Sequence, residues 1–155
     1  DVILSKTPAL KQMVDAYSKV GGNMVAVEEV PMEQVHRYGI LDVDQDDGKI
    51  ASAKGLVEKP NAEDAPSNLS IIGRYILQPE IFDILDKRET GAGGEIQLTD
   101  AIAKMIGPMP FHGFRFDGTR YDCGNKAGFV AANVAFAMAR EDVADDVRNM
   151  VKDLV

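Results

Sequence analysis

The sequence predicts an α/β fold in which helices flank a mixed β-sheet. Short runs of β-branched and apolar residues alternate with segments whose apolar residues recur every three or four positions. The strand-like runs come in clusters, with helical segments between and after them, which is typical of a mixed sheet with helices on its faces. The length of 155 residues favours one domain over residues 1–155.

The first predicted helix covers residues 9–20 and ends at two glycines. Its apolar positions lie at helical spacing: Leu10, Met13, Val14 and Tyr17. Further helices are expected after Pro79 and after a glycine-rich loop. Two more helices are expected at the end of the chain. Their expected ranges are residues 79–89, 96–106, 126–141 and 143–155.

Strands are expected where β-branched residues gather between turn signals. Gly73 interrupts one of these runs, which indicates a β-bulge or a close backbone approach. Residues 111–124 are expected to form a strand, a turn and a second strand. The other expected strands are residues 23–30, 38–44, 49–60 and 69–78, of which the second and third are joined by a turn at 45–49.

The C-terminal helices carry an apolar stripe whose meaning the sequence leaves open. Val143, Val147, Val151 and Leu154 share one helical face. Burial in the core is the first interpretation. A contact between subunits, made by residues 125–155, is the second because the stripe is terminal.

The composition excludes several classes of function. The net charge is −8, which argues against nucleic-acid partners because they bind clustered Lys and Arg. No apolar run is long enough to span a bilayer, so no membrane partner is expected. One cysteine, Cys123, cannot form an intramolecular disulfide, and we expect a cytoplasmic location.

Two further segments suggest ligands but fit them poorly. The acidic run at residues 42–49 fails as a calcium loop, because the positions that need Gly and Glu hold Asp47 and Ala53. A solvated hairpin turn is the better interpretation. The glycine-rich residues 91–94 lack the Lys-Ser/Thr of a P-loop. They are expected to cap the following helix, with Glu95 in its first turn.

Two motifs place charged groups at strand ends. In residues 57–60, Glu58 offers an acceptor for sugar hydroxyls and Lys59 a cation for phosphate, although spacing alone favours a surface salt bridge. In residues 120–126, Asp122 could bind Mg²⁺ and Lys126 could meet phosphate.

Cys123 lies inside the second motif and invites a nucleophile hypothesis. His36 and His112 are distant in sequence, and neither forms a recognisable Cys-His motif with it. A buried, inert thiol is therefore the better interpretation.

The whole set of motifs resembles the sugar-1-phosphate nucleotidyltransferases. Five segments in order carry the resemblance: residues 27–40, 55–60, 71–77, 93–102 and 120–129. That family's G-x-G-T-R loop for the nucleoside triphosphate does not occur in these 155 residues. The chain therefore resembles the sugar-binding, C-terminal part of a Rossmann-like nucleotidyltransferase fold, and we expect it to be inactive alone.

The resemblance implies a Mg²⁺-dependent transfer from UTP to glucose 1-phosphate, which gives UDP-glucose and pyrophosphate in a homodimer or homotetramer. It implies catalytic roles for Lys59 and Lys126 and a metal role for Asp122. The substrate-binding residues it implies are Gly39, Glu58, Lys59, Gly73 and Lys126. Two alternatives stay open: a non-catalytic sugar-phosphate binding module, and a sister enzyme such as a thymidylyltransferase.

Overall fold

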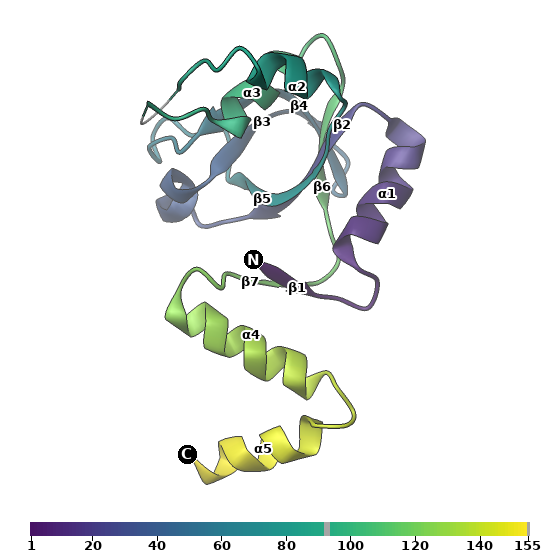
Figure 1. Cartoon of the computed structure of the whole chain (residues 1–155), viewed down its shortest axis with the longest axis vertical. Coiled ribbons are helices and arrows are strands. Elements are labelled where there is room, and N and C mark those ends of the chain that lie inside the picture. The colour runs from purple at the N-terminus through teal and green to yellow at the C-terminus, as the bar shows by residue number, and fades with distance from the viewer. Residues whose placement is uncertain (92–93, 155) are drawn as a thin grey trace. The chain divides into compact units, whose positions relative to one another are not determined.

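The computed structural model describes residues 1–91 and 94–154 (Figure 1). These residues group into two compact units. One unit is Leu10–Phe116, and the other joins Asp1–Ala9 to the chain from Asp117 onward. A single domain over residues 1–155 therefore stays a prediction.

The larger unit contains a five-stranded mixed sheet that closes into a barrel (Figure 1). β2 pairs with β6 in parallel, and the other neighbours pair antiparallel. The prediction of a mixed sheet with helices is confirmed, whereas its closure was not foreseen. In barrel order the strands are β2 (Asn23–Glu29), β5 (Leu69–Ile76), β3 (Gly39–Asp46), β4 (Ile50–Glu58) and β6 (Phe111–Arg115).

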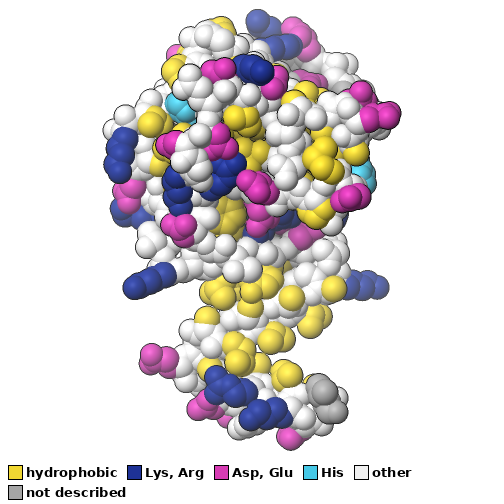
Figure 2. All heavy atoms as spheres, turned by 180° about the vertical axis from the view of Figure 1, so that it is seen from behind, with side chains coloured by type: hydrophobic (Ala, Val, Ile, Leu, Met, Phe, Trp, Pro, Cys, Tyr) yellow, Lys and Arg dark blue, Asp and Glu magenta, His cyan; other side chains and the backbone are white. Residues whose placement is uncertain are grey.

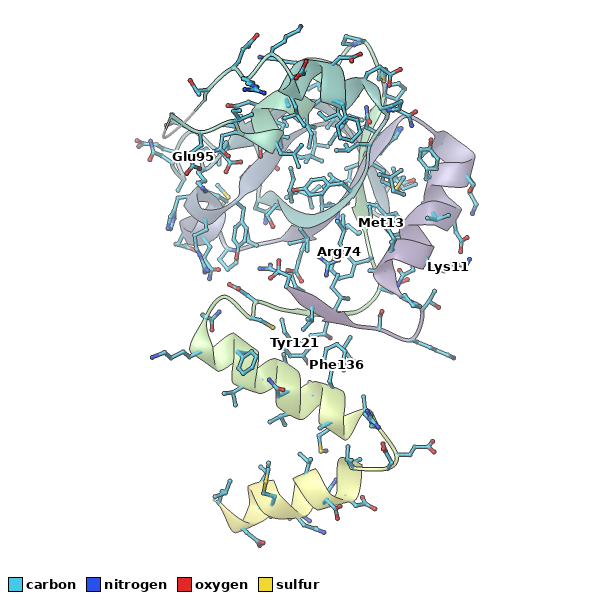
Figure 3. The ribbon with its side chains drawn as sticks, viewed as in Figure 1. Lys11, Met13, Arg74, Glu95, Tyr121 and Phe136 are labelled. Atoms are coloured by element: carbon cyan, nitrogen blue, oxygen red, sulfur yellow. The ribbon has the colours of Figure 1, made fainter. Side chains whose placement is uncertain are left out.

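Successive side chains of a strand point to opposite faces of the sheet, so the apolar residues of β2 belong to two different hydrophobic clusters. Val25 and Val27 of β2 belong to a cluster that includes residues of α2 (Glu80–Leu85) and α3 (Leu98–Met105). Met24 and Ala26, the alternate residues, belong to a second cluster. That cluster contains Met13 of α1 (Ala9–Val20), so α1 covers the opposite face of β2 from the first cluster (Figure 3).

The predicted helices form, with two differences. On α1, Met13 is fully buried, but Leu10 and Val14 are 52% and 44% exposed, because the buried face runs through positions 9, 13 and 16. α2 ends at Leu85 rather than at residue 89.

Two local features shape the entry to β3 and the middle of β5. A 3₁₀ helix, η1 (Met32–Arg37), was not predicted; its buried Val35 packs in a cluster with Ile40 of β3. The register between β5 and β2 shifts in the middle of β5: Tyr75 pairs with Val25 and Ile71 pairs with Val27, so four residue steps in β5 lie opposite two in β2. The bulge predicted at Gly73 is therefore confirmed.

In the smaller unit, β1 (Val2–Leu4) pairs antiparallel with β7 (Thr119–Tyr121), and α4 (Lys126–Met138) and α5 (Ala144–Asp153) follow. The expected strands in residues 111–124 both form, but β6 joins the barrel and β7 joins β1 instead of each other. Within the described residues, no helix combines the length and apolar character needed to cross a membrane.

The apolar stripe of α5 is not a core. No residue of α5 is buried, and Leu154 is 77% exposed. Hydrophobic side chains gather along α4 and α5 on the face seen in Figure 2. The core interpretation therefore fails for the described chain, and the subunit contact of residues 125–155 stays a prediction.

Candidate functional site

Gly39 and Glu58 form a direct pair at one end of the barrel, where β3 begins and β4 ends. A β-carbon added to Gly39 would lie 3.2 Å from Oε2 of Glu58, 3.3 Å from Cδ1 of Ile71 and 3.4 Å from Cγ2 of Thr99. Glycine thus lets three side chains close over the strand. The Glu58 side chain is only 13% exposed, so its carboxylate is held in a largely buried place.

Lys59 leaves the strand in an unusual backbone conformation. Its φ is +48°, in the left-handed region that costs a non-glycine residue about 1 kcal/mol. Its N–H still donates to the carbonyl of Tyr38 at 2.9 Å, and the next residue, Pro60, is buried. Strain of this kind persists where the surroundings determine the backbone, and it is frequent at functional sites.

The side chains of Lys59 and Glu58 form an ion pair with unequal exposure. Nζ of Lys59 lies 3.5 Å from Oε1 of Glu58, and the lysine side chain is 57% exposed. The salt bridge expected from the sequence forms, but only Lys59 lies at the surface, because the Glu58 carboxylate is mostly removed from water. A buried acceptor beside an exposed cation can bind a ligand that has both hydroxyl and phosphate groups.

Two neighbours of this pair were missed from the sequence. The pKa of Tyr75 is raised by burial and then by the Glu58 carboxylate, which places the phenol of β5 near that charge. Thr99, in the first turn of α3, meets Gly39 from the other side. Both residues lie in segments that carry the family resemblance, 71–77 and 93–102, but nothing in the local sequence connects them to Glu58.

Gly73 is exposed at the bulge of β5. A β-carbon added there would meet nothing within 4 Å. The position is open, as a residue beside a ligand would need. Its role next to the sugar stays a prediction.

The smaller unit carries the second group of predicted site residues. Asp122 follows β7, and its Oδ1 accepts a hydrogen bond from the Gly124 N–H at 2.9 Å. Asn125 caps α4: its Oδ1 accepts from the Gly128 N–H at 2.7 Å, and its Nδ2 donates to the Asp122 carbonyl at 3.2 Å. Lys126 is exposed as the first residue of α4.

A second carboxylate lies across the strand pair from Asp122. Val2 is opposite Tyr121 in the β1–β7 ladder, so Asp1 and Asp122 occupy facing positions just beyond that pair. Oδ1 of Asp1 is 3.3 Å from Nε of Arg120, whose side chain is 7% exposed.

These oxygen donors fit Mg²⁺. Mg²⁺ is commonly held by one or two carboxylates, with waters and substrate phosphates as its other ligands. In the described parts of the chain, three or more His, Cys, Asp or Glu residues nowhere gather to hold a metal. An all-protein metal cage among these residues is therefore not the kind of site this chain offers.

Cys123 lies among apolar side chains. Its Sγ is 3.8 Å from the Tyr121 carbonyl. It lines an apolar pocket of about 240 Å³ together with Val2, Phe129, Ala132, Asn133 and Phe136. Tyr121 and Phe136 form an edge-to-face ring pair beside it (Figure 3), with centroids 6.4 Å apart. Among the residues that the structure describes, no basic side chain lines this pocket, which supports a packing role for the thiol.

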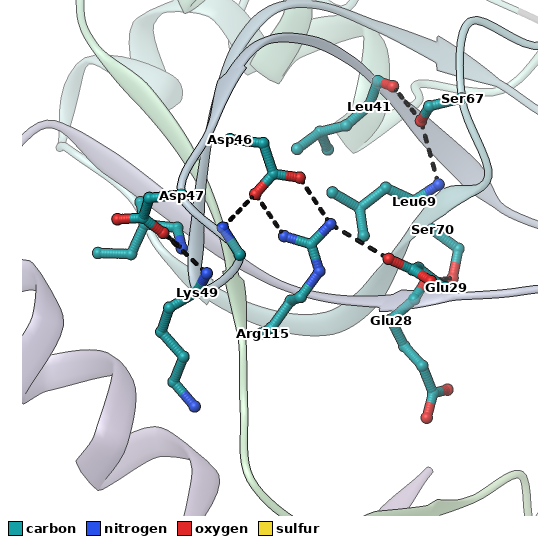
Figure 4. Close-up of polar contacts among 12 residues, drawn as sticks. Glu28, Glu29, Leu41, Asp46, Asp47, Lys49, Ser67, Leu69, Ser70 and Arg115 are labelled. Carbon is teal, nitrogen blue, oxygen red and sulfur yellow. Dashed lines mark hydrogen bonds and ion pairs between the residues drawn. The ribbon is translucent and has the colours of Figure 1, made fainter.

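The acidic hairpin is a structural turn. Arg115 donates to both carboxylate oxygens of Asp46 at 2.8 Å, and Asp47 accepts from the N–H groups of Lys49 and Ile50 (Figure 4). The Arg115 hydrogen bond lowers the pKa of Asp46, and the two backbone donors lower that of Asp47. These carboxylates already have partners, as expected of a solvated turn rather than a calcium loop.

The glycine-rich loop lies partly outside the described residues, because Ala92 and Gly93 are not among them. The prediction that Glu95 lies in the first turn of the following helix is wrong. α3 begins at Leu98, and Asp100 is the acid of its first turn. Glu95 lies before the helix, where its carbonyl accepts from the Gly91 N–H at 2.9 Å.

Two groups of residues are thus available, one in each unit. The barrel unit holds Gly39, Glu58, Lys59 and Gly73, and the smaller unit holds Asp122 and Lys126. The carboxylate and cation of the barrel unit are groups that can bind hydroxyls and phosphate, and the carboxylate of the smaller unit is a group that can bind Mg²⁺. Their roles stay predictions.

Comparison with known proteins identifies the family to which the chain belongs. Residues 1–138 match the model of the nucleotidyl transferase family, and the chain belongs to this family. It is 59% identical over 126 residues to a UTP–glucose-1-phosphate uridylyltransferase of Komagataeibacter xylinus, covering 81% of this chain and 44% of the relative. It is 46% identical to the enzyme of that name from Staphylococcus haemolyticus, covering 99% of this chain and 54% of the relative.

Solved structures agree. A UDP-glucose pyrophosphorylase complexed with UDP-glucose is 42% identical with a TM-score of 0.82, over 89% of this chain and 53% of that one. A UTP-bound enzyme of the same kind from Acinetobacter baumannii is 30% identical with a TM-score of 0.86, and the match covers 99% of this chain and 54% of that one. The predicted fold class and the resemblance are confirmed. The chain spans about half the length of these relatives.

Proposed function

We propose that the full-length protein containing this chain transfers the uridylyl group of UTP to glucose 1-phosphate. The observation that carries the proposal is the 46% identity, over 154 residues, to a relative named for this reaction. A phosphate oxygen of glucose 1-phosphate forms a bond to the α-phosphorus of UTP. The bond from that phosphorus to the leaving diphosphate breaks, and pyrophosphate departs with its electron pair.

The barrel unit would hold the sugar phosphate. Glu58, fixed against Gly39, would accept hydrogen bonds from sugar hydroxyls, and exposed Lys59 would hold the phosphate. Gly73 would leave room beside the ring. Catalysis by these groups is positioning and charge neutralisation, and it needs no covalent enzyme intermediate.

The smaller unit would supply the metal and a second cation. Asp122, and Asp1 across the strand pair, would hold Mg²⁺, and Lys126 would meet phosphate. When bound, Mg²⁺ neutralises phosphate charge and orients the triphosphate for in-line attack. The half-buried thiol of Cys123 has no part in this chemistry.

The direct test is pyrophosphate release by the full-length protein with UTP and glucose 1-phosphate. We expect Mg²⁺-dependent release that Asp122→Asn reduces far more than Cys123→Ser. Equal and large losses from both variants would contradict the assignment of the site. The 155 residues alone are expected to form no UDP-glucose, and measurable turnover by them would refute that expectation.

The same assay separates the alternatives. A sugar-phosphate binding module would bind glucose 1-phosphate in calorimetry, weakened by Lys59→Ala, but release no pyrophosphate. A thymidylyltransferase would turn over dTTP faster than UTP. A cytoplasmic location and a homodimer or homotetramer accompany the proposal, since the reaction consumes a cytoplasmic nucleotide and residues 125–155 present apolar side chains.

A further inference from the structure

We propose that Asn125 is a positioning residue that holds Asp122 in place for its metal. This inference rests on the proposed function, because it takes Asp122 as a Mg²⁺ ligand. Asn125 makes two hydrogen bonds that lie on opposite sides of its amide: Oδ1 accepts from the Gly128 N–H and Nδ2 donates to the Asp122 carbonyl. The side chain thereby connects the first turn of α4 to the residue that follows β7.

Two hydrogen bonds and one close approach surround Asp122. The Asn125 amide bonds its carbonyl at 3.2 Å, and the Gly124 N–H bonds its Oδ1 at 2.9 Å. A β-carbon on Gly128 would overlap the Asp122 carbonyl oxygen, so only glycine lets the helix pass this close. These contacts restrict both the main chain and the carboxylate of Asp122, as outer contacts do for metal ligands generally.

The two hydrogen bonds of Asn125 have separable effects. Its oxygen caps the helix, and Ser and Asp are caps of similar quality. Its amide N–H has no counterpart in either replacement at the same reach. Asn125→Ser and Asn125→Asp should therefore keep α4 stable and remove the bond to Asp122. The added carboxylate of Asn125→Asp would by itself attract a cation, so weaker metal binding in that variant would reflect the lost bond.

The test is Mn²⁺ binding to the full-length protein in the presence of UDP-glucose, with free Mn²⁺ followed by electron paramagnetic resonance. Mn²⁺ takes the same oxygen ligands as Mg²⁺. We expect Asn125→Ser and Asn125→Asp to weaken binding by about tenfold, typical of losing a contact behind a ligand. Thermal unfolding should stay within a few degrees of the parent. Asn133→Ser is the matched control, because the Asn133 amide donates within α4, to the Phe129 carbonyl, rather than to Asp122.

Asp122→Asn separates this inference from the function on which it rests. If Asp122→Asn abolishes Mn²⁺ binding while both Asn125 variants bind like the parent, the positioning role is wrong and the metal role stands. If Asp122→Asn binds Mn²⁺ normally, the metal role fails and the inference fails with it. Weakening by both Asn125 variants at unchanged thermal stability, with Asn133→Ser normal, supports the proposal.

Discussion

At the scale of single residues, Gly39 decides where the Glu58 carboxylate can lie. Gly39→Ala would place a methyl group 3.2 Å from Oε2 of Glu58. We expect a loss of about 1 kcal/mol in unfolding free energy, the low end for overpacking, because the neighbours are side-chain ends. The KM for glucose 1-phosphate should rise about tenfold, since a charged hydrogen bond of roughly 1.5 kcal/mol is disturbed.

Gly73→Ala provides the comparison for Gly39→Ala. Its β-carbon would meet nothing within 4 Å, so unfolding should be unchanged. Steady-state kinetics measure the KM for glucose 1-phosphate of both variants, and urea unfolding measures their unfolding free energies. An unaltered KM in Gly39→Ala would mean that Glu58 does not contact the sugar.

Lys59 combines a strained backbone with a predicted catalytic side chain. Because its φ is +48°, Lys59→Gly should be more stable than Lys59→Ala by up to about 1 kcal/mol. Both variants should lose activity together, because both lack the cation. Chemical unfolding and turnover of the pair test this separation of stability from function. Equal stability of the two variants would show that the backbone relaxes when the side chain is removed.

At the scale of elements, β6 carries a histidine whose environment opposes protonation. Neither ring nitrogen of His112 has a hydrogen-bond partner among the described residues, and both are buried. Burial lowers its pKa from the ordinary value of 6.5. The unfolded chain therefore binds a proton more readily than the folded one. Neutral His112 therefore leaves the folded state at its full stability above about pH 6.5. That stability falls as the pH drops from 6.5 toward the lowered pKa of the folded state.

His112→Gln should flatten the dependence of unfolding free energy on pH between pH 7.5 and 5. His36→Gln, at an exposed position of η1, is the control and should keep the slope of the parent. Urea unfolding at several pH values measures it. A slope that survives in His112→Gln would assign the effect to other groups.

Strand positions were predictable from the sequence because alternation and turn residues are local signals. The turn between β3 and β4 was found in this way, although it occupies residues 47–49 rather than 45–49 because β3 continues to Asp46. The bulge at Gly73 was found in the same way. Barrel closure was not, because the β2–β6 ladder pairs residues more than 80 positions apart, such as Val25 and Gly113.

The same distinction holds for the site. Glu58 is the last residue of β4 and Asp122 follows β7, so both could be proposed from local strand-end signals. Thr99 reaches Gly39 only through the fold. Asn125 carried a readable signal, since Asn before a helical run is a usual N-cap, but its bond to Asp122 required the structure.

At the scale of the whole molecule, α4 and α5 leave much apolar surface uncovered. Val130, Met150 and Leu154 are all more than half exposed, and large exposed apolar patches favour association. We expect the isolated chain to self-associate in sedimentation velocity at micromolar concentration. Val130→Glu with Leu154→Gln should shift it toward monomer. Lys6→Glu with Lys19→Gln, which alters charge at exposed positions, is the control and should not; a monomeric parent chain would contradict the expectation.

The parallel pairing of β2 with β6 also orders events during synthesis. It joins residues 23–27 to residues 111–115, so the barrel cannot close before residue 115 has left the ribosome. Until then the edge of β2 that β6 joins in the folded chain lacks that strand partner. We therefore expect the barrel to close late during synthesis, when its last strand, β6, pairs with β2 and β4.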